Sequence, residues 1–228
     1  MPDTARAPQP TAAASASTPA RGRPRVGRLA IGLLGRILLV TVVAFAIGGL
    51  TPLGQAALPD ALASLANSVG GWLIPTAALV FLFARGTIEA AVEGALAFVA
   101  MTMGYAVVSA ARGDVFDPSV WAFIGVFAGP IVGLAALGVR RRGLTAAIGA
   151  AVLGGILVGE GAYGLTVVAD TTSPIWWFLE IAVGVAIVVA VSIRMRRTGL
   201  IAIAVLGMAA IGLAFWAAFT LLPVLLVL

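Results

Sequence analysis

The sequence predicts an all-α polytopic membrane protein, a transmembrane helix bundle of about seven spans. The 228-residue chain is 61% hydrophobic and only 10% charged, and its apolar residues form long continuous stretches. A soluble domain of this size cannot hide so much apolar surface from water. Each stretch is close to the roughly 20 residues that one helical crossing of a bilayer requires. A transmembrane barrel would show shorter segments with alternating polarity instead.

The spans follow a leader of different composition. Residues 1–27 are rich in Pro, Ala, Ser, Thr and Arg, so we expect a disordered cytoplasmic N-terminal leader before a transmembrane helical domain over residues 28–228. A cleavable signal peptide ending near Ala46 is the competing interpretation, but the apolar run continues past that point, which favours a retained first span. The expected spans are 30–54, 61–84, 87–110, 119–139, 144–168, 174–193 and 199–226.

Local signals support several of these boundaries. Asp60 is placed to cap the second span, while Asp117 and Ser173 each precede a proline at the start of a later span. Pro75 and Pro130 fall inside spans and should kink them.

The basic residues predict an orientation. All 14 are arginines, and if the N-terminus is cytoplasmic then 13 of them lie on the inner side, leaving only Arg112 outside. This positive-inside bias explains the net charge of +5 better than nucleic-acid binding does. We therefore expect a multi-pass protein of a bacterial cell membrane with its C-terminus outside. The five tryptophans then fall toward the outer leaflet, as in an aromatic belt.

Two patterns concern helix packing. Arg85-Gly86, Arg142-Gly143 and Arg197-Thr198-Gly199 each mark an inner turn, which favours three hairpin repeats after the first span. The alternative is that bilayer thickness alone sets this hairpin length.

Small residues also recur at intervals of four and predict close approach of helix backbones. They lie on the fourth span (Gly125, Gly129, Gly133) and on the fifth (Gly143, Ala147, Ala151, Gly155, Gly159).

Composition excludes several kinds of chemistry. The chain has no cysteine and no histidine, so it can form no disulfide, thiolate nucleophile, Cys/His metal site or histidine-based triad. No nucleotide-binding motif is present either. We expect no enzymatic activity, no cofactor, no metal ligands and no nucleic-acid partner. The lipid bilayer is the expected partner, with a small solute as a second one, and protein partners stay open.

Acidic side chains inside the expected spans need a reason, because ionisable groups are costly in lipid. Glu89 lies near the start of the third span, where the helix dipole favours it and Arg85 is within reach. Glu93 lies one turn deeper on the same face, where the two carboxylates could share a proton.

A second set of polar residues falls at similar depth in the outer half of several spans. One interpretation is an outward-facing pocket for a small polar or cationic solute. The alternatives are interhelical hydrogen bonds, worth roughly 0.6 kcal/mol each, or side chains that reach the interface. The candidate ligand-binding residues are Gln55, Asn67, Ser68, Tyr105, Glu160, Tyr163 and Glu180.

Several short motifs among these residues resemble an uncharacterised family of multi-pass bacterial integral membrane proteins. They cover roughly residues 45–195 and comprise Leu50-Thr51-Pro52-Leu53-Gly54-Gln55, Leu65-Ala66-Asn67-Ser68 with Trp72, Gly104-Tyr105, Gly129-Pro130 with Gly133, and Gly159-Glu160-Gly161 with Tyr163. The resemblance implies the architecture but no activity, since this domain of unknown function has none assigned. The arginine-bearing leader is outside the family pattern.

Two functions are compatible with these observations. The first is binding or transport of a small polar or cationic solute through the outer polar residues, which the prolines inside spans and the hairpins support. The second is a non-catalytic structural or assembly protein without a ligand, which the small-residue ladders and short loops support.

Overall fold

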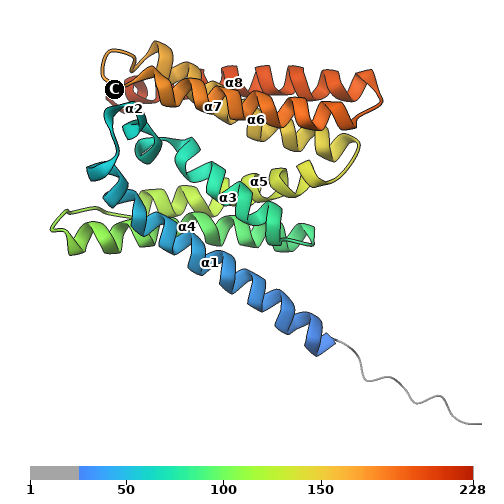
Figure 1. The fold of residues 1–228 in the computed structure, drawn as a ribbon, viewed down its shortest axis with the longest axis horizontal. Helices are drawn as coiled ribbons and strands as arrows, with labels where there is room; N and C mark the ends of the chain where they lie inside the picture. The colour runs from blue at the N-terminus through green and yellow to red at the C-terminus, as the bar shows by residue number, and fades with distance from the viewer. Residues whose placement is uncertain (1–25, 228) are drawn as a thin grey trace, which may run out of the picture.

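The computed structural model describes the backbone of residues 26–227 and the side chains of residues 32–221, so almost all of the expected leader lies outside the described residues. The described part is helical throughout, which confirms the predicted fold class (Figure 1). Its elements are α1 (Val26–Ala57), α2 (Asp60–Ala63), the 3₁₀ helix η1 (Ser64–Asn67), α3 (Val69–Phe83), α4 (Thr87–Ala111), α5 (Ser119–Arg140), α6 (Leu144–Thr166), α7 (Pro174–Arg194) and α8 (Thr198–Val227).

Six of the helices are long and apolar enough to cross a bilayer, and the second expected span is broken. The segment of α2 and η1 meets α3 at a bend of 65°. The 15 residues of α3 extend only about 22 Å, less than the roughly 30 Å of a hydrocarbon core. The prediction of one continuous helix over 61–84 was therefore wrong at its outer end, because α3 begins only at Val69.

The helix caps follow from this break. Asp60 begins α2 and makes no capping bond to α3, contrary to the prediction, whereas Ser68 Oγ accepts from the Gly71 N–H at 2.9 Å. The Ser173 cap is present, since Ser173 accepts from the Ile175 N–H at the start of α7. Asp117 lies one residue before the N-cap of α5, which is Pro118, and accepts from the Ser119 N–H at 2.9 Å. Hydrogen bonds from the side chain and the backbone of Ser119 lower the pKa of the Asp117 carboxyl.

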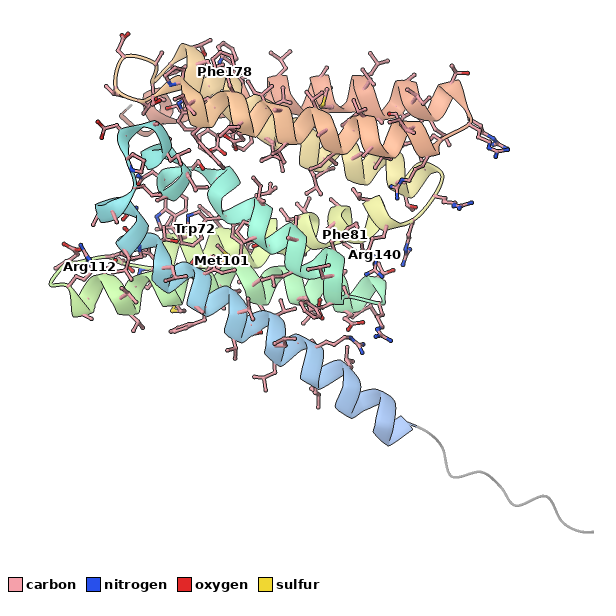
Figure 2. All side chains as sticks on the ribbon, in the orientation of Figure 1. Trp72, Phe81, Met101, Arg112, Arg140 and Phe178 are labelled. Atoms are coloured by element: carbon pink, nitrogen blue, oxygen red, sulfur yellow. The ribbon has the colours of Figure 1, made fainter. Side chains whose placement is uncertain are left out.

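Arginine side chains connect the ends of several helices on one side of the bundle. The Arg36 side chain on α1 reaches Glu89 at the start of α4. At the end of α5, Arg140 donates to the carbonyls of Phe81 (2.8 Å) and Ala84 (2.7 Å), which closes the end of α3. Figure 2 shows guanidinium nitrogens gathered at this end of the bundle, which we call the arginine end, with Arg112 at the opposite end.

The helices form two groups with α3 between them (Figure 1). In one group α4 packs against α1 and α5, and in the other α6 packs against α7 and α8. The interface of α5 with α6 joins the groups, and α3 contributes Leu73 and Val80 to a core shared with α4, α5 and α6. The start of α3 is therefore surrounded by protein.

The small-residue ladders do bring backbones close, but not with the partners that their adjacency in sequence suggests. On α5, Gly129 and Gly133 face the backbone of α4, at Gly94 and Ala90. On α6, Gly155 and Gly159 face α8 rather than α5. The ladders of α5 and α6 thus belong to two separate interfaces.

The three expected hairpins share the alternating topology but do not pack alike. Helices α5 and α6 pack against each other along an extensive interface, whereas the interfaces of α3 with α4 and of α7 with α8 are small.

Two of the five tryptophans do not fit the expected aromatic belt, because Trp176 and Trp177 are buried inside the protein. The helices α3 and α5 continue through Pro75 and Pro130.

We predict that Gly129→Ala lowers the unfolding free energy by about 1–3 kcal/mol, the usual effect of overpacking a close interface. A Cβ atom there would lie 2.5 Å from the Gly94 carbonyl oxygen and 2.7 Å from the Ala95 Cα. Gly35→Ala is the matched control, because that helical glycine has nothing within 4 Å of its Cβ position. Unfolding of both variants in mixed micelles measures the difference, and equal midpoints would contradict the packing described.

Candidate functional site

The break in the second span frees backbone N–H groups inside the bundle, and Glu160 of α6 accepts two of them. The Val69 N–H donates to Glu160 Oε1 at 2.5 Å, and the Gly70 N–H donates to Oε2 at 2.6 Å. Ser68 accepts the third bond, from Gly71. Glu160 is only 4% exposed, so these contacts replace its water. A carboxylate at a helix N-terminus also interacts favourably with the helix dipole.

A second carboxyl group, that of Glu180 on α7, lies against the same turn. Glu180 is completely buried, and its carboxyl group lies against that of Glu160; apart from that contact, no described residue donates a hydrogen bond to its oxygens. A Cβ atom at Gly70 would collide with Glu180 Oε1, so the carboxyl group of Glu180 lies directly against this glycine. No described arginine pairs with Glu160 or Glu180. Two acidic groups from neighbouring helices therefore meet at Gly70, with backbone N–H groups serving only one of them.

A tryptophan side chain connects the start of α3 to α7. The Trp176 Nε1–H donates to Ser68 Oγ at 3.0 Å, and both side chains are buried. Ser68 thus receives a bond from Trp176 while it caps α3. The contact fixes the start of α3 against the helix that carries Glu180.

Gln55, Asn67 and Tyr105 form a separate network on the other side of the break. Gln55 Nε2 donates to Asn67 Oδ1 at 2.8 Å and to the Ala66 carbonyl at 3.2 Å, and the Tyr105 hydroxyl donates to Gln55 Oε1 at 3.0 Å. Asn67 is exposed, while Gln55 and Tyr105 are half-buried. The network joins α1 and α4 to the end of η1.

Six of the seven candidate residues thus lie around the break, in two groups. One group contains Ser68, Glu160 and Glu180, and the other contains Gln55, Asn67 and Tyr105. The seventh, Tyr163, packs edge-on against Phe219 of α8, with ring centroids 5.8 Å apart. Nothing among the described contacts joins Tyr163 to either group.

At the arginine end, Glu89 and Glu93 occupy different environments. Glu89 Oε1 accepts from Arg36 Nε at 2.6 Å, and its Oε2 accepts from the backbone N–H groups of Arg85 and Gly86. The side chain that pairs with Glu89 is thus Arg36, not Arg85 as expected. Glu93 is fully buried, and its oxygens have no hydrogen-bond partner among the described residues.

Sequence reasoning missed Gly70, Trp176 and the two backbone donors of the site. One signal for them was present: Ser68 followed closely by Gly70 and Gly71 inside an apolar stretch is typical of a helix break. No sequence pattern pointed to the contact between Trp176 and Ser68.

We predict that Glu160→Gln destabilises the protein, because an amide oxygen replaces one end of a carboxylate that serves two N–H groups. Hydrogen bonds to a charged group contribute about 1.5–3 kcal/mol, and Gln keeps one acceptor, so we expect a loss of this order or somewhat less. Glu180→Gln should retain or raise stability, because it keeps the shape and removes an ionisable group that nothing serves. Thermal unfolding in detergent measures both, and a lower midpoint for Glu180→Gln than for Glu160→Gln would overturn this assignment.

Comparison with known proteins adds the family. No curated protein and no solved structure matches the chain. A family model matches residues 28–224, which nearly coincides with the described helices and extends beyond the motifs recognised in the sequence. The resemblance to an uncharacterised membrane-protein family is thereby confirmed, and the chain belongs to a family of unknown function (DUF6518).

Proposed function

We propose that this membrane protein binds a small cation at Glu160 and Glu180, beside the break in the second span. It would carry the cation across the bilayer and would not act as an enzyme. The observation that carries the proposal is the complete burial of Glu180 beside the carboxyl group of Glu160, with no backbone N–H or basic side chain among the described residues to compensate it.

The argument starts from the energetics of buried charge. An isolated carboxylate inside a protein or a membrane is strongly disfavoured unless a proton or a cation neutralises it. Glu160 has the N–H groups of Val69 and Gly70, but Glu180 has no such donor. Glu180 therefore needs a positive partner. Its carboxyl group lies directly against Gly70, so the smallest cation, a proton, is the partner that we assign to it in this conformation.

The break supplies a route for exchange. Discontinuous helices form the ion and substrate sites of many secondary transporters, where backbone groups and half-helix ends face the ligand. Here α2 and η1 rest on α1 and α7, and Asn67 at their end is exposed. A shift of this short segment would open the carboxyl pair to the outer side, where an external cation replaces the proton on Glu180.

A ligand-free structural role is the second candidate, and the contacts of Glu160 favour it. That carboxylate is satisfied by α3 alone, and Gln55, Asn67 and Tyr105 satisfy one another. Under this alternative Glu180 stays protonated at all times and exchanges nothing.

Proton exchange in proteoliposomes distinguishes the two functions. Vesicles containing the purified protein and a trapped pH indicator would receive pulses of Na⁺, K⁺ or a small organic amine from outside. We expect at least one of these cations to drive proton movement in the wild type, because it competes with the proton for Glu180. We expect Glu180→Gln to reduce the initial rate strongly, because it removes the carboxyl group that we assign as the proton carrier while Glu160 stays bound to the N–H groups of α3.

Asp170→Asn is the control, since it removes an exposed carboxylate from the loop between α6 and α7. It should leave the rate unchanged. If no cation moves protons, or if Glu180→Gln exchanges as fast as the wild type, the carrier proposal fails and the structural role is retained.

We also propose that the arginine end faces the cytosol of a bacterial cell, as the positive-inside bias favours. Because the chain has no cysteine, single cysteines can report accessibility without background. Asp170→Cys lies at the outer end, and Gly199→Cys lies at the arginine end in open space. A membrane-impermeant maleimide should label Asp170→Cys in intact cells and Gly199→Cys only after lysis. The reverse pattern would invert the orientation.

A further inference from the structure

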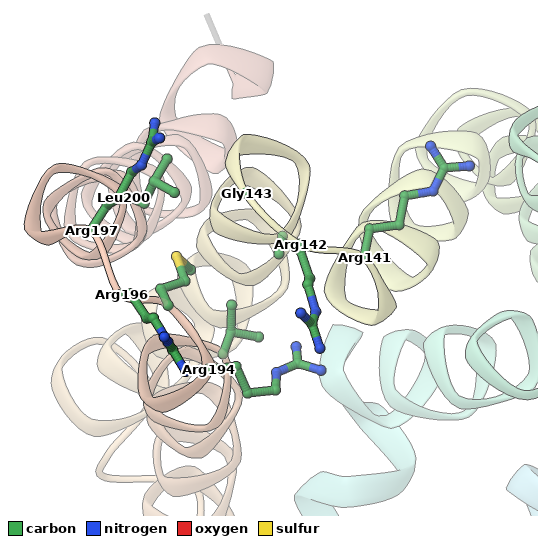
Figure 3. Close-up of a pocket in the computed structure, with 10 residues that line it drawn as sticks. Arg141, Arg142, Gly143, Arg194, Arg196, Arg197 and Leu200 are labelled. Carbon is green, nitrogen blue, oxygen red and sulfur yellow. The ribbon is translucent and has the colours of Figure 1, made fainter.

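The turn from α5 to α6 and the turn from α7 to α8 enclose a pocket of about 250 Å³ at the arginine end (Figure 3). Five arginines and an apolar wall line it: Arg141, Arg142, Gly143, Ala146, Val191, Arg194, Met195, Arg196, Arg197 and Leu200. None of the residues of the carboxylate site contributes to this pocket. Its properties therefore call for a separate explanation.

The charges in this pocket are uncompensated. In Figure 3 the guanidinium groups of Arg142 and Arg194 point toward one another, whereas Arg141 and Arg197 point away. No acidic side chain among the described residues forms an ion pair with any of the five arginines. These arginines are exposed, so solvent screens their charges in part, but converging guanidinium groups still repel one another. An anion between them would remove it.

The positive-inside bias does not account for this convergence. That bias requires arginines on the cytoplasmic side but gives them no common direction. Arg85 shows the difference, since it is exposed at the same end and does not line the pocket. Arg142 and Arg196 make no side-chain hydrogen bond to the described protein, so both are available to a ligand. Arg194 is oriented by its bond to the Val139 carbonyl.

The chemistry of the pocket selects the ligand class. Guanidinium groups match the geometry of phosphate oxygens and bind them with paired hydrogen bonds. Apolar side chains, those of Ala146, Val191 and Leu200, line the same pocket between the arginines. A basic pocket between transmembrane helices at the cytoplasmic boundary lies at the depth of lipid headgroups.

We propose that this pocket binds a phosphate-bearing anion through Arg142, Arg194 and Arg196, and that its source is the headgroup of an anionic phospholipid in the inner leaflet. The phosphate lies between the guanidinium groups, and the apolar wall contacts the glycerol and upper acyl carbons. The site is independent of the cation site and of its proposed exchange.

Retention of phosphatidylglycerol by the detergent-purified protein, measured by native mass spectrometry, tests this site. Phosphatidylcholine, which carries a phosphate but no net charge, is the reference lipid. We expect the wild type to prefer phosphatidylglycerol, Arg142→Gln to bind it about fivefold more weakly, and Arg142→Gln/Arg196→Gln to bind it more weakly still. Neither substitution removes a hydrogen bond within the described protein, so both variants should fold.

Arg85→Gln is the matched control, since it removes one exposed arginine from the same end outside the pocket. It should retain the wild-type preference. An equal loss in Arg85→Gln and Arg142→Gln would overturn the proposal, because it would assign the binding to diffuse surface charge.

A second arm separates the two sources of phosphate. Inorganic phosphate is added to delipidated protein, with sodium chloride at equal ionic strength as the reference. Suppose that phosphate stabilises the wild type but not Arg142→Gln, and that the protein retains no phosphatidylglycerol. This result would support the phosphate site and assign it to a soluble anion. If neither probe binds the wild type in preference to its reference, the proposal is overturned.

Discussion

The structure depends on how the backbone N–H groups at the start of α3 are satisfied. A bilayer provides no water for such groups, so a helix break at membrane depth is tolerated only where protein supplies acceptors. The second span breaks at Ser68, and acceptors come from Glu160 on α6 and from Ser68 itself. The break therefore requires α6 beside it, and the position of α3 between the two groups of helices follows from this requirement.

The same requirement explains the position of Glu180. For Glu160 to reach the N–H groups of Val69 and Gly70, α6 must lie close to α3, and α7 packs along α6. Trp176 then holds α7 against Ser68. One turn further along α7, Glu180 is forced against Gly70 with no donor left for it. The arrangement that satisfies the N–H groups of α3 with one carboxylate thus places a second carboxyl group beside it that no backbone N–H group reaches.

The sequence predicted the all-helical fold and the six long apolar helices, because hydropathy is a local property of the chain. It did not predict contacts between distant elements. Glycine spacing indicated that backbones approach closely, but only the fold assigns Gly129 to α4 and Gly155 to α8. Likewise, the pairing of Glu89 with Arg36 crosses two helices, whereas the expected partner Arg85 is only four residues away.

The two ends of the bundle differ in the sign of most of their charged side chains. At the break, two carboxyl groups are buried, and helix N–H groups donate to only one of them, that of Glu160. At the arginine end, Arg140 satisfies helix carbonyls at the end of α3, while Arg142 and Arg196 stay at the surface without protein partners. The long helices connect these ends through their glycine interfaces, whereas the short segment of α2 and η1 mainly contacts α1, α3 and α7 near the break.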